Sequence, residues 1–341
     1  MRASFAALAL LSTCGGERGP TSAAPAPVAA AESVPVIAVT DPKVSANAGC
    51  ERCHAQIAAE WRTSLHAQSW NDPVFLSAYA IEPLSFCRSC HAPEAPLDDA
   101  SSPARHLGVA CITCHVPDGK SAGEHVTFAS RAADAEGCAS CHQFEFPEPQ
   151  EAAMQSTVEE HAASPHSDET CGGCHMRARP GAKPHRDHSF RVWGDDKLLA
   201  RSIAASARRG LERTVEISLS ADGAGHAVPT GDMFRRLEVR ATAGDGADAL
   251  TAEPVTLARS FTRQRTEQGI RRIQVGDNRV PASGEPAIAR LVFPRPVRRL
   301  PVRWEVVYRR MGPREAALFG VDLEAEAIVV AKGTLDPEPT P

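Results

Sequence analysis

The last third of the chain shows the clearest alternation of apolar and polar positions. Short runs with a period of two are separated there by turns that contain Gly, Pro, Asp and Asn. About seven such runs occur, at residues 214–219, 237–241, 255–261, 272–275, 287–293, 302–308 and 325–331. Alternation is typical of strands with one buried face, and this number and spacing predict two packed sheets. We therefore expect residues 214–335 to form an all-β sandwich domain.

Helical patterns precede this region in two places. Residues 197–213 are rich in Ala, Leu and Arg, which favours a linking helix. Further upstream, the run from Cys53 to His66 has the apolar spacing of one amphipathic helix. We expect residues 49–196 to form a domain of short helices and loops. The predicted fold class is therefore α + β.

The first residues have the pattern of an export signal. Arg2 precedes an apolar run over residues 3–11 that is too short to cross a membrane. Residues 11–14, Leu-Ser-Thr-Cys, resemble the lipobox of bacterial lipoproteins, in which Cys14 would become a lipid anchor; a plain cleaved signal is the alternative. Residues 1–14 are thus interpreted as a signal, and residues 15–48, rich in Pro and Ala, as a disordered linker. We expect an exported protein in the periplasm or at the outer membrane or cell surface.

Ten of the eleven cysteines belong to one repeated pattern, Cys-x-x-Cys-His. The cysteines of its five copies are Cys50 and Cys53, Cys87 and Cys90, Cys111 and Cys114, Cys138 and Cys141, and Cys171 and Cys174. The histidines that follow them are His54, His91, His115, His142 and His175. This is the attachment motif of c-type haem, in which two cysteines bind the vinyl groups of one porphyrin and the next histidine becomes the proximal iron ligand.

Other cysteine chemistries fit this pattern poorly. A zinc ribbon has two Cys pairs about 15–20 residues apart and needs no histidine after each pair, whereas here three of the four gaps are wider and the histidine is always present. A disulfide framework has no reason to space every pair alike. The sequence therefore predicts five covalently bound haems. Porphyrins would also supply the flat apolar bulk that is scarce in a chain with only 5% aromatic residues.

Eight further histidines are available for the opposite faces of five irons. They are His66, His106, His125, His161, His166, His185, His188 and His226. Complete bis-histidine ligation is therefore possible by count. His66 follows His54 by twelve residues, which is about 18 Å along a continuous helix, whereas two ligands of one iron lie about 4 Å apart. We expect His66 to bind the iron of a neighbouring haem.

Three blocks of the haem region resemble multihaem cytochromes related to hydroxylamine oxidoreductase and its tetrahaem acceptor cytochrome. The blocks are residues 50–66 (CERCH…EWRTSLH), 108–126 (GVACITCH…GEHV) and 154–190 (MQST…CGGCHM…HSF). In that superfamily the histidine after the Gly turn of the second block, and the histidine before Phe in the third, bind iron. The resemblance therefore implies distal roles for His125 and His188. Relatives more often have Trp at the position of His161, so His161 is interpreted as not being a ligand.

Residues 225–231, Gly-His-Ala-Val-Pro-Thr-Gly, resemble an element of cytochromes that carry a β-domain after the haems. This resemblance implies that His226 crosses from the β-domain to bind an iron. The complete set of distal candidates is His66, His106, His125, His188 and His226. Met154 and Met233 remain alternatives for one methionine-ligated haem.

Irons with two protein ligands favour electron transfer. We expect one-electron exchange with redox partner proteins, either other cytochromes or membrane quinol-oxidising complexes. Two alternatives stay open: a multihaem reductase or oxidase of small nitrogen or sulfur compounds with one open haem, and a subunit of a polymeric cytochrome wire. Residues 1–200 contain 15 Lys and Arg against 24 Asp and Glu, so nucleic acid is not an expected partner.

Overall fold

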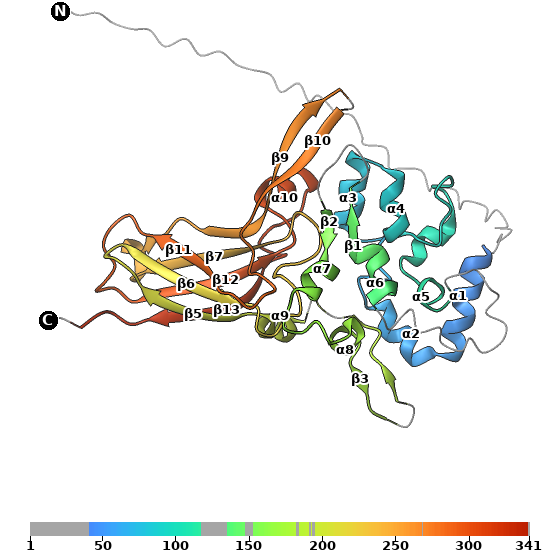
Figure 1. The fold of residues 1–341 in the computed structure, drawn as a ribbon, viewed down its shortest axis with the longest axis horizontal. Coiled ribbons are helices and arrows are strands. Elements are labelled where there is room, and N and C mark those ends of the chain that lie inside the picture. Colours follow the sequence, from blue (N-terminus) through green and yellow to red (C-terminus); the bar gives the residue numbers. More distant parts are fainter. Residues whose placement is uncertain are drawn as a thin grey trace, which may run out of the picture. The chain divides into compact units, whose positions relative to one another are not determined.

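The computed structural model describes residues 41–116, 135–146, 153–181, 184–190, 192, 195–267 and 269–339 (Figure 1). The expectations for the signal at residues 1–14, the lipid anchor at Cys14, most of the linker, and His125 lie outside the described residues. Among the described helices, none is long and apolar enough to cross a membrane.

Helix α1 (Pro42–Cys53) begins inside the segment expected to be a disordered linker, so that expectation is wrong for residues 42–48. Asp41 caps the helix, because its carboxylate accepts hydrogen bonds from the backbone N–H groups of Lys43 (2.8 Å) and Val44 (3.4 Å). Pro42 occupies the first turn, where its missing N–H costs nothing. The Pro- and Ala-rich composition of this segment predicted a linker, although Asp41 and Pro42 form a typical capped helix N-terminus.

The single helix expected from Cys53 to His66 is interrupted and shorter. The chain leaves helical geometry at His54 (φ −113°, ψ 46°), and α2 (Ala55–Arg62) follows it. Beyond α2, the buried Ser64 hydroxyl donates a 2.6 Å hydrogen bond to the carbonyl three residues earlier. Such a bond competes with continuation of the helix. His66 therefore lies in a turn.

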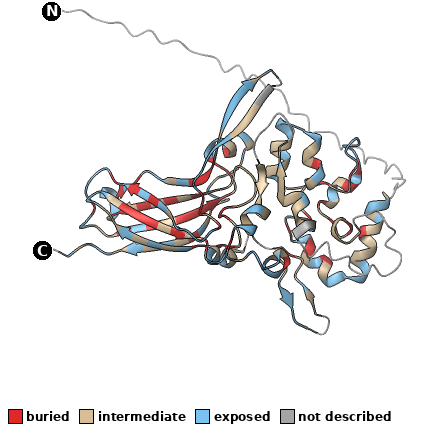
Figure 2. Cartoon of the chain, viewed as in Figure 1, coloured by how far each residue is buried: buried red, intermediate tan, exposed pale blue. Residues whose placement is uncertain are grey.

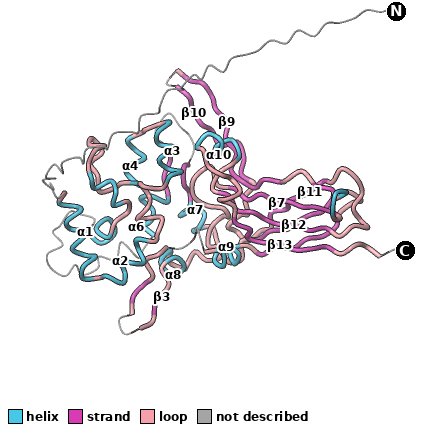
Figure 3. Tube along the Cα trace, turned by 180° about the vertical axis from the view of Figure 1, so that it is seen from behind, coloured by secondary structure: helices cyan, strands magenta, loops and turns pink. Residues whose placement is uncertain are grey.

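The rest of the N-terminal region consists of short helices and two small hairpins, as the secondary-structure colouring shows (Figure 3). The helices are α3 (Pro73–Ile81), α4 (Ser85–His91), η1 (Pro103–Leu107), α5 (Cys111–His115), α6 (Ala135–His142), α7 (Thr157–Ala162) and α8 (Cys171–His175). The hairpins pair β1 (Gln143–Glu145) with β2 (Ala153–Ser156) and β3 (Ala178–Arg179) with β4 (His185–Arg186). The expected pattern of short helices and loops is observed.

The linking helix expected over residues 197–213 is largely replaced by a strand. α9 (Asp196–Ser202) is followed by β5 (Ala204–Arg209), which pairs antiparallel with β6 (Thr214–Ser220). Ala205 and Ala207 of β5 pack against the core of the sandwich. Strand pairing overrides the high intrinsic helix propensity of alanine here.

The C-terminal strands form two antiparallel sheets. Their remaining members are β7 (Arg236–Ala243), β8 (Leu250–Thr251), β9 (Val255–Thr266), β10 (Gly269–Asp277), β11 (Ala287–Val292), β12 (Val302–Arg309) and β13 (Ile328–Leu335). Within the described residues one sheet has the order β10-β9-β7-β12-β13, with β8 beside β7, and the other has the order β11-β6-β5. A 3-10 turn, η3 (Gly246–Asp248), and a helix, α10 (Pro313–Phe319), connect strands. The fold is α + β, with a β-sandwich after the helical region.

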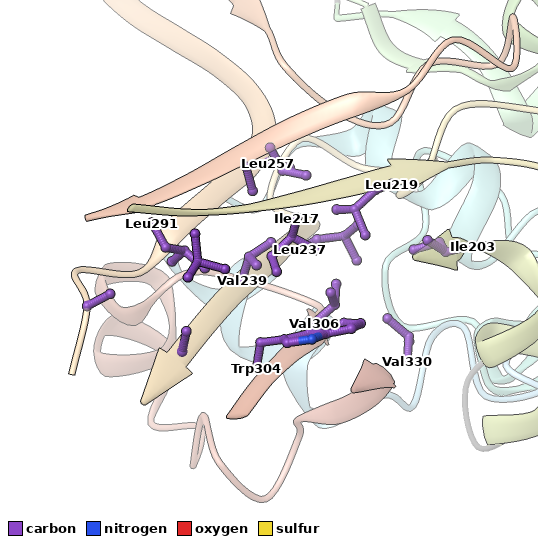
Figure 4. Packing of buried hydrophobic residues seen from close by; sticks show 14 of the residues in the cluster. Ile203, Ile217, Leu219, Leu237, Val239, Leu257, Leu291, Trp304, Val306 and Val330 are labelled. Atoms are coloured by element: carbon purple, nitrogen blue, oxygen red, sulfur yellow. The ribbon is translucent and has the colours of Figure 1, made fainter. Parts of the chain in front are cut away.

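The apolar core lies mainly between these two sheets (Figure 4). In β7 every second residue is buried, which matches the alternation in the sequence. Ile217, Leu237, Leu291 and Val306 are fully buried. Each such side chain contributes roughly 1.5–3 kcal/mol when it is removed from water. The sandwich therefore has a conventional core of its own.

The helical region lacks a comparable core (Figure 2). Among its described residues, most of the buried apolar side chains form two small clusters. One contains Trp61, Ala67, Ala110 and Ile112, and the other contains Trp70, Ala92, Ala95 and Ala104. Large apolar side chains are exposed in the same region, among them Ile81 and Leu97. Protein contacts alone bury little apolar surface here.

Candidate functional site

All five Cys-x-x-Cys-His motifs lie on short helices. Helices α4, α5, α6 and α8 end at their motif histidine, and α1 ends one residue before His54. Residues three apart are neighbours on a helix surface, so the two cysteines of a motif project from the same side. All ten motif cysteines are free of disulfide bonds. Their thiols are therefore available for thioether bonds.

Three motif histidines face a second histidine ring at one common distance. The ring centroids are 6.2 Å apart in the pairs His115–His188, His142–His66 and His175–His226. Two imidazoles on opposite faces of one metal ion, each bonded at about 2 Å, have centroids about 6 Å apart. The spacing of each pair therefore fits one iron between the rings.

The pair His175–His226 connects the fifth motif with the loop that follows β6. The two ring planes are parallel within 8°. Nδ1 of His226 donates a 3.0 Å hydrogen bond to the carbonyl of Ala227, which leaves Nε2 free. Burial and the nearby rings of His226 and His142 lower the pKa of His175 to about 4, and burial also lowers the pKa of His226. Both rings are thus neutral near pH 7, which is the form that binds metal.

The pair His66–His142 involves the fourth motif, and its ring planes are inclined at 62°. Nδ1 of His142 donates to Oε1 of Gln155 at 3.1 Å. Burial and the rings of His142 and His175 lower the pKa of His66 to about 4. The carbonyl of His66 accepts the N–H of Val109 at 2.8 Å, which fixes the turn that carries the ring. His66 therefore lies opposite the fourth motif and not opposite the first motif, which directly precedes it in the chain.

The pair His115–His188 belongs to the third motif, and its ring planes are inclined at 35°. Nδ1 of His188 donates to the carbonyl of Arg186 at 2.7 Å, and its backbone N–H donates to the Glu60 carboxylate at 3.1 Å. The buried hydroxyl of the adjacent Ser189 has no hydrogen-bond partner in the described part of the chain. A buried hydroxyl without a partner costs free energy. A bound group with acceptor oxygens, such as a haem propionate, would satisfy it.

The first and second motifs differ from the other three. Within the described residues, no second histidine ring faces His54 or His91 at the spacing of the three pairs. Nδ1 of His91 donates to the carbonyl of Ser69 at 2.7 Å, and its ring stacks on Phe75 with centroids 3.7 Å apart. His91 is therefore oriented as a metal ligand would be, with Nε2 free.

The other described histidines are engaged elsewhere. Nδ1 of His106 lies 2.8 Å from Oδ1 of Asn71, and the structure does not bring this exposed ring opposite a motif histidine. Both ring nitrogens of His161 contact backbone carbonyls, at 2.7 and 2.9 Å. His166 approaches the carbonyl of Asp222 at 3.4 Å, and His185 contacts Glu60 at 2.9 Å. His161 therefore has no nitrogen left for iron.

Sequence reasoning missed the acceptors that orient the ligand rings. Three of them are the backbone carbonyls of Ser69, Arg186 and Ala227. Every residue has a backbone carbonyl, so the sequence does not indicate which ones accept these hydrogen bonds. The fourth is the side chain of Gln155, which lies in a block that resembles other cytochromes. That resemblance is the sequence feature that could have indicated a role for Gln155.

Two arginines of the β-domain form a hydrogen-bonded contact and an ion pair with residues of the helical region. Arg259 donates to the carbonyls of Ala153 (2.8 Å) and Met154 (2.7 Å). Arg310 forms an ion pair with Asp72, near the start of α3. Arg259 also donates to the carbonyl of Gly231 at 2.9 Å, so it joins the end of the loop of His226 to the helical region.

The fold and the site together define a class: a region of short Cys-x-x-Cys-His helices with facing histidine pairs, followed by a β-sandwich. A solved structure shares this fold, that of a penta-heme cytochrome c552 from Thermochromatium tepidum. The two chains superpose with a TM-score of 0.63 and 20% sequence identity, over 84% of this chain and 97% of the other. No family model and no curated protein matches the chain.

Proposed function

We propose that this chain is a pentahaem c-type cytochrome that transfers single electrons between redox partners. The observation that carries the proposal is the set of three facing histidine pairs at 6.2 Å. Each pair joins a motif histidine to a histidine distant in sequence. The fold shared with a penta-heme cytochrome supports the same assignment. Bound haem iron would supply the one-electron chemistry.

The chain's own part is to close both faces of three irons. In each pair the protein fixes at least one ring through its Nδ1–H or through its backbone, which would leave Nε2 to hold the iron of a bound haem. Two protein ligands leave no position for a substrate. This arrangement favours electron transfer over catalysis at the third, fourth and fifth sites.

Several of the five sites are also close to one another. Asn47 of α1 accepts a 3.0 Å hydrogen bond from the backbone N–H of Cys111, so the helices of the first and third motifs are in contact. Helices α4 and α6 are in contact, so the second and fourth motifs adjoin. The fourth and fifth motifs adjoin through His142 and His175. Such proximity supports electron exchange between the haems.

The proposal is tested by the cofactor load and ligation of the purified protein. We expect mass spectrometry to show five haems per chain, and EPR to show low-spin signals from bis-histidine irons. Fewer than five haems, or a spectrum without bis-histidine signals, would contradict the proposal.

A second candidate function is catalysis at an open iron. The observation that favours it is the lack, within the described residues, of a histidine opposite His54 or His91. His125, Met154 or Met233 would close one of these irons if it binds there. Carbon monoxide binding to the reduced protein distinguishes the two candidate functions. An electron carrier with two protein ligands on every iron should bind little carbon monoxide. Binding of one equivalent per chain would identify an open haem and favour a reductase or oxidase of small nitrogen or sulfur compounds.

The location and partners belong to the same proposal. The N-terminal pattern and the periplasmic chemistry of haem attachment favour an exported protein, with Cys14 as its lipid anchor. Its partners would then be other cytochromes or membrane quinol-oxidising complexes. A lipid-modified N-terminal peptide beginning at Cys14 is the expected mass-spectrometric result, and cleavage after Cys14 would exclude the anchor. A polymeric wire would be recognised as filaments in electron micrographs.

A further inference from the structure

The loop that carries His226 is held at successive positions by the rest of the protein. The carbonyl of Gly225 accepts a 2.7 Å hydrogen bond from the ring of His161. The backbone of Val228 pairs with that of Val280 in both directions, at 2.9 and 3.0 Å. The carbonyl of Gly231 accepts from Arg259 at 2.9 Å. The loop over residues 225–231 is therefore fixed at both ends and in its middle.

Between these points, a buried ion pair contacts two consecutive residues of the loop. Nη1 of Arg279 donates to the carbonyl of Pro229 at 3.0 Å, and Nη2 lies 2.7 Å from Oε1 of Glu160. The other carboxylate oxygen of Glu160 accepts a 2.6 Å hydrogen bond from the Thr230 hydroxyl. Arg279 is only 8% exposed. The acid comes from α7 of the helical region and the base from the segment after β10.

The pair is anchored on both sides. Asp277 receives hydrogen bonds from Nε (2.9 Å) and Nη2 (2.6 Å) of Arg279. Burial works against the charge of Arg279, but Asp277 and Glu160 together raise its pKa. Ser156 donates to Glu160 at 3.0 Å. Removing Glu160 would leave a buried guanidinium without one of its two carboxylates. The Thr230 hydroxyl would lose its carboxylate acceptor and keep only the hydroxyl of Thr157, at 2.8 Å.

We propose that Glu160 and Arg279 are positioning residues for the distal iron ligand of the fifth haem. They act through the loop, which they hold so that His226 lies opposite His175. Ligand rings function only when they are held to within about 0.5 Å of the productive geometry. The inference rests on the proposed function, because it needs an iron between His175 and His226.

The test compares holoprotein variants of the full chain. In Glu160→Ala we expect the reduced protein to bind up to one equivalent of carbon monoxide beyond wild type, and one haem potential to rise. Glu160→Gln keeps an oxygen acceptor for Thr230 and should give a smaller effect. The control is Glu216→Ala on β6, whose carboxylate pairs with Arg208 and Arg290 away from the loop; its haem spectrum should equal that of wild type.

A double variant separates positioning from general stability. His226→Ala should convert one low-spin haem to high-spin, and adding Glu160→Ala to it should change the haem spectra no further, because both changes act on the same ligand. Wild-type spectra in both Glu160 variants, or an additive effect in the double variant, would overturn the positioning role. A wild-type spectrum in His226→Ala would instead contradict the ligand pair of the proposed function.

Discussion

The facing histidines share one feature at the scale of single residues. Nδ1 of His142, His188 and His226 donates to a fixed oxygen, so Nε2 would be available to the proposed iron. The same arrangement occurs at His91. Hydrogen bonds of this kind set the tautomer, orient the ring and raise its basicity toward the metal. The residues that hold the rings therefore matter almost as much as the rings themselves.

The first prediction concerns His66. Because its ring lies opposite His142, His66→Ala should open the haem attached at Cys138 and Cys141, and not the one attached at Cys50 and Cys53. EPR should show one new high-spin iron, and a crystal structure of the reduced carbon monoxide complex should identify the haem that binds the gas. His106→Ala is the matched control, since that exposed ring contacts Asn71. A new high-spin iron on the first motif would contradict this pairing.

At the scale of elements, the turn after α2 determines where His66 points. Gly108 has φ of 60°, and a Cβ at this position would lie 2.4 Å from the His66 carbonyl and 2.7 Å from that of Ala67. Val109 then donates to the same His66 carbonyl. The close approach of two backbone segments thus requires glycine.

Gly108→Ala should therefore displace His66. The left-handed backbone alone costs an alanine on the order of 1–3 kcal/mol, and the clash with the carbonyls adds to it. We expect a lower melting temperature and partial high-spin character at one haem, measured by calorimetry and EPR. Gly49→Ala in α1 is the control, because only a flexible arginine atom lies near its added Cβ, at 3.8 Å. Equal spectra for both variants would show that the turn does not position the ring.

The elements also show how far the sequence predicts the structure. The strands follow from alternation, and the haem helices follow from the cysteine motifs. By contrast, β5 is predicted as a helix because alanine has a high helix propensity. The start of α1 is predicted as a linker because the sequence around Asp41 is rich in Pro. The rings of His66 and His142 face each other because of tertiary packing, which local sequence patterns do not encode. The resemblance suggested His226 as a ligand, but not its partner His175.

At the scale of the whole molecule, the two regions have different sources of stability. The sandwich buries a continuous aliphatic core, whereas the described part of the helical region has two small clusters and exposed apolar side chains. Backbone ordering costs roughly 1–2 kcal/mol per residue, so the helical region needs additional apolar contacts. Haems would supply them and form most of its core.

Protein produced without haem attachment should therefore fold only in part. We expect hydrogen exchange to protect strands β6, β7 and β12 and to leave residues 41–190 mostly unprotected. Helical circular dichroism should be largely lost. Full protection of the helices in haem-free protein would show that they are stable without the cofactor.

The central claim is that irons lie between the facing histidines, and anomalous scattering at the iron edge tests it most directly. We expect five iron peaks per chain in a crystal of the holoprotein. Three of them should lie between the Nε2 atoms of His66 and His142, His115 and His188, and His175 and His226. Fewer than five peaks, or histidine pairs with no iron between them, would contradict the account.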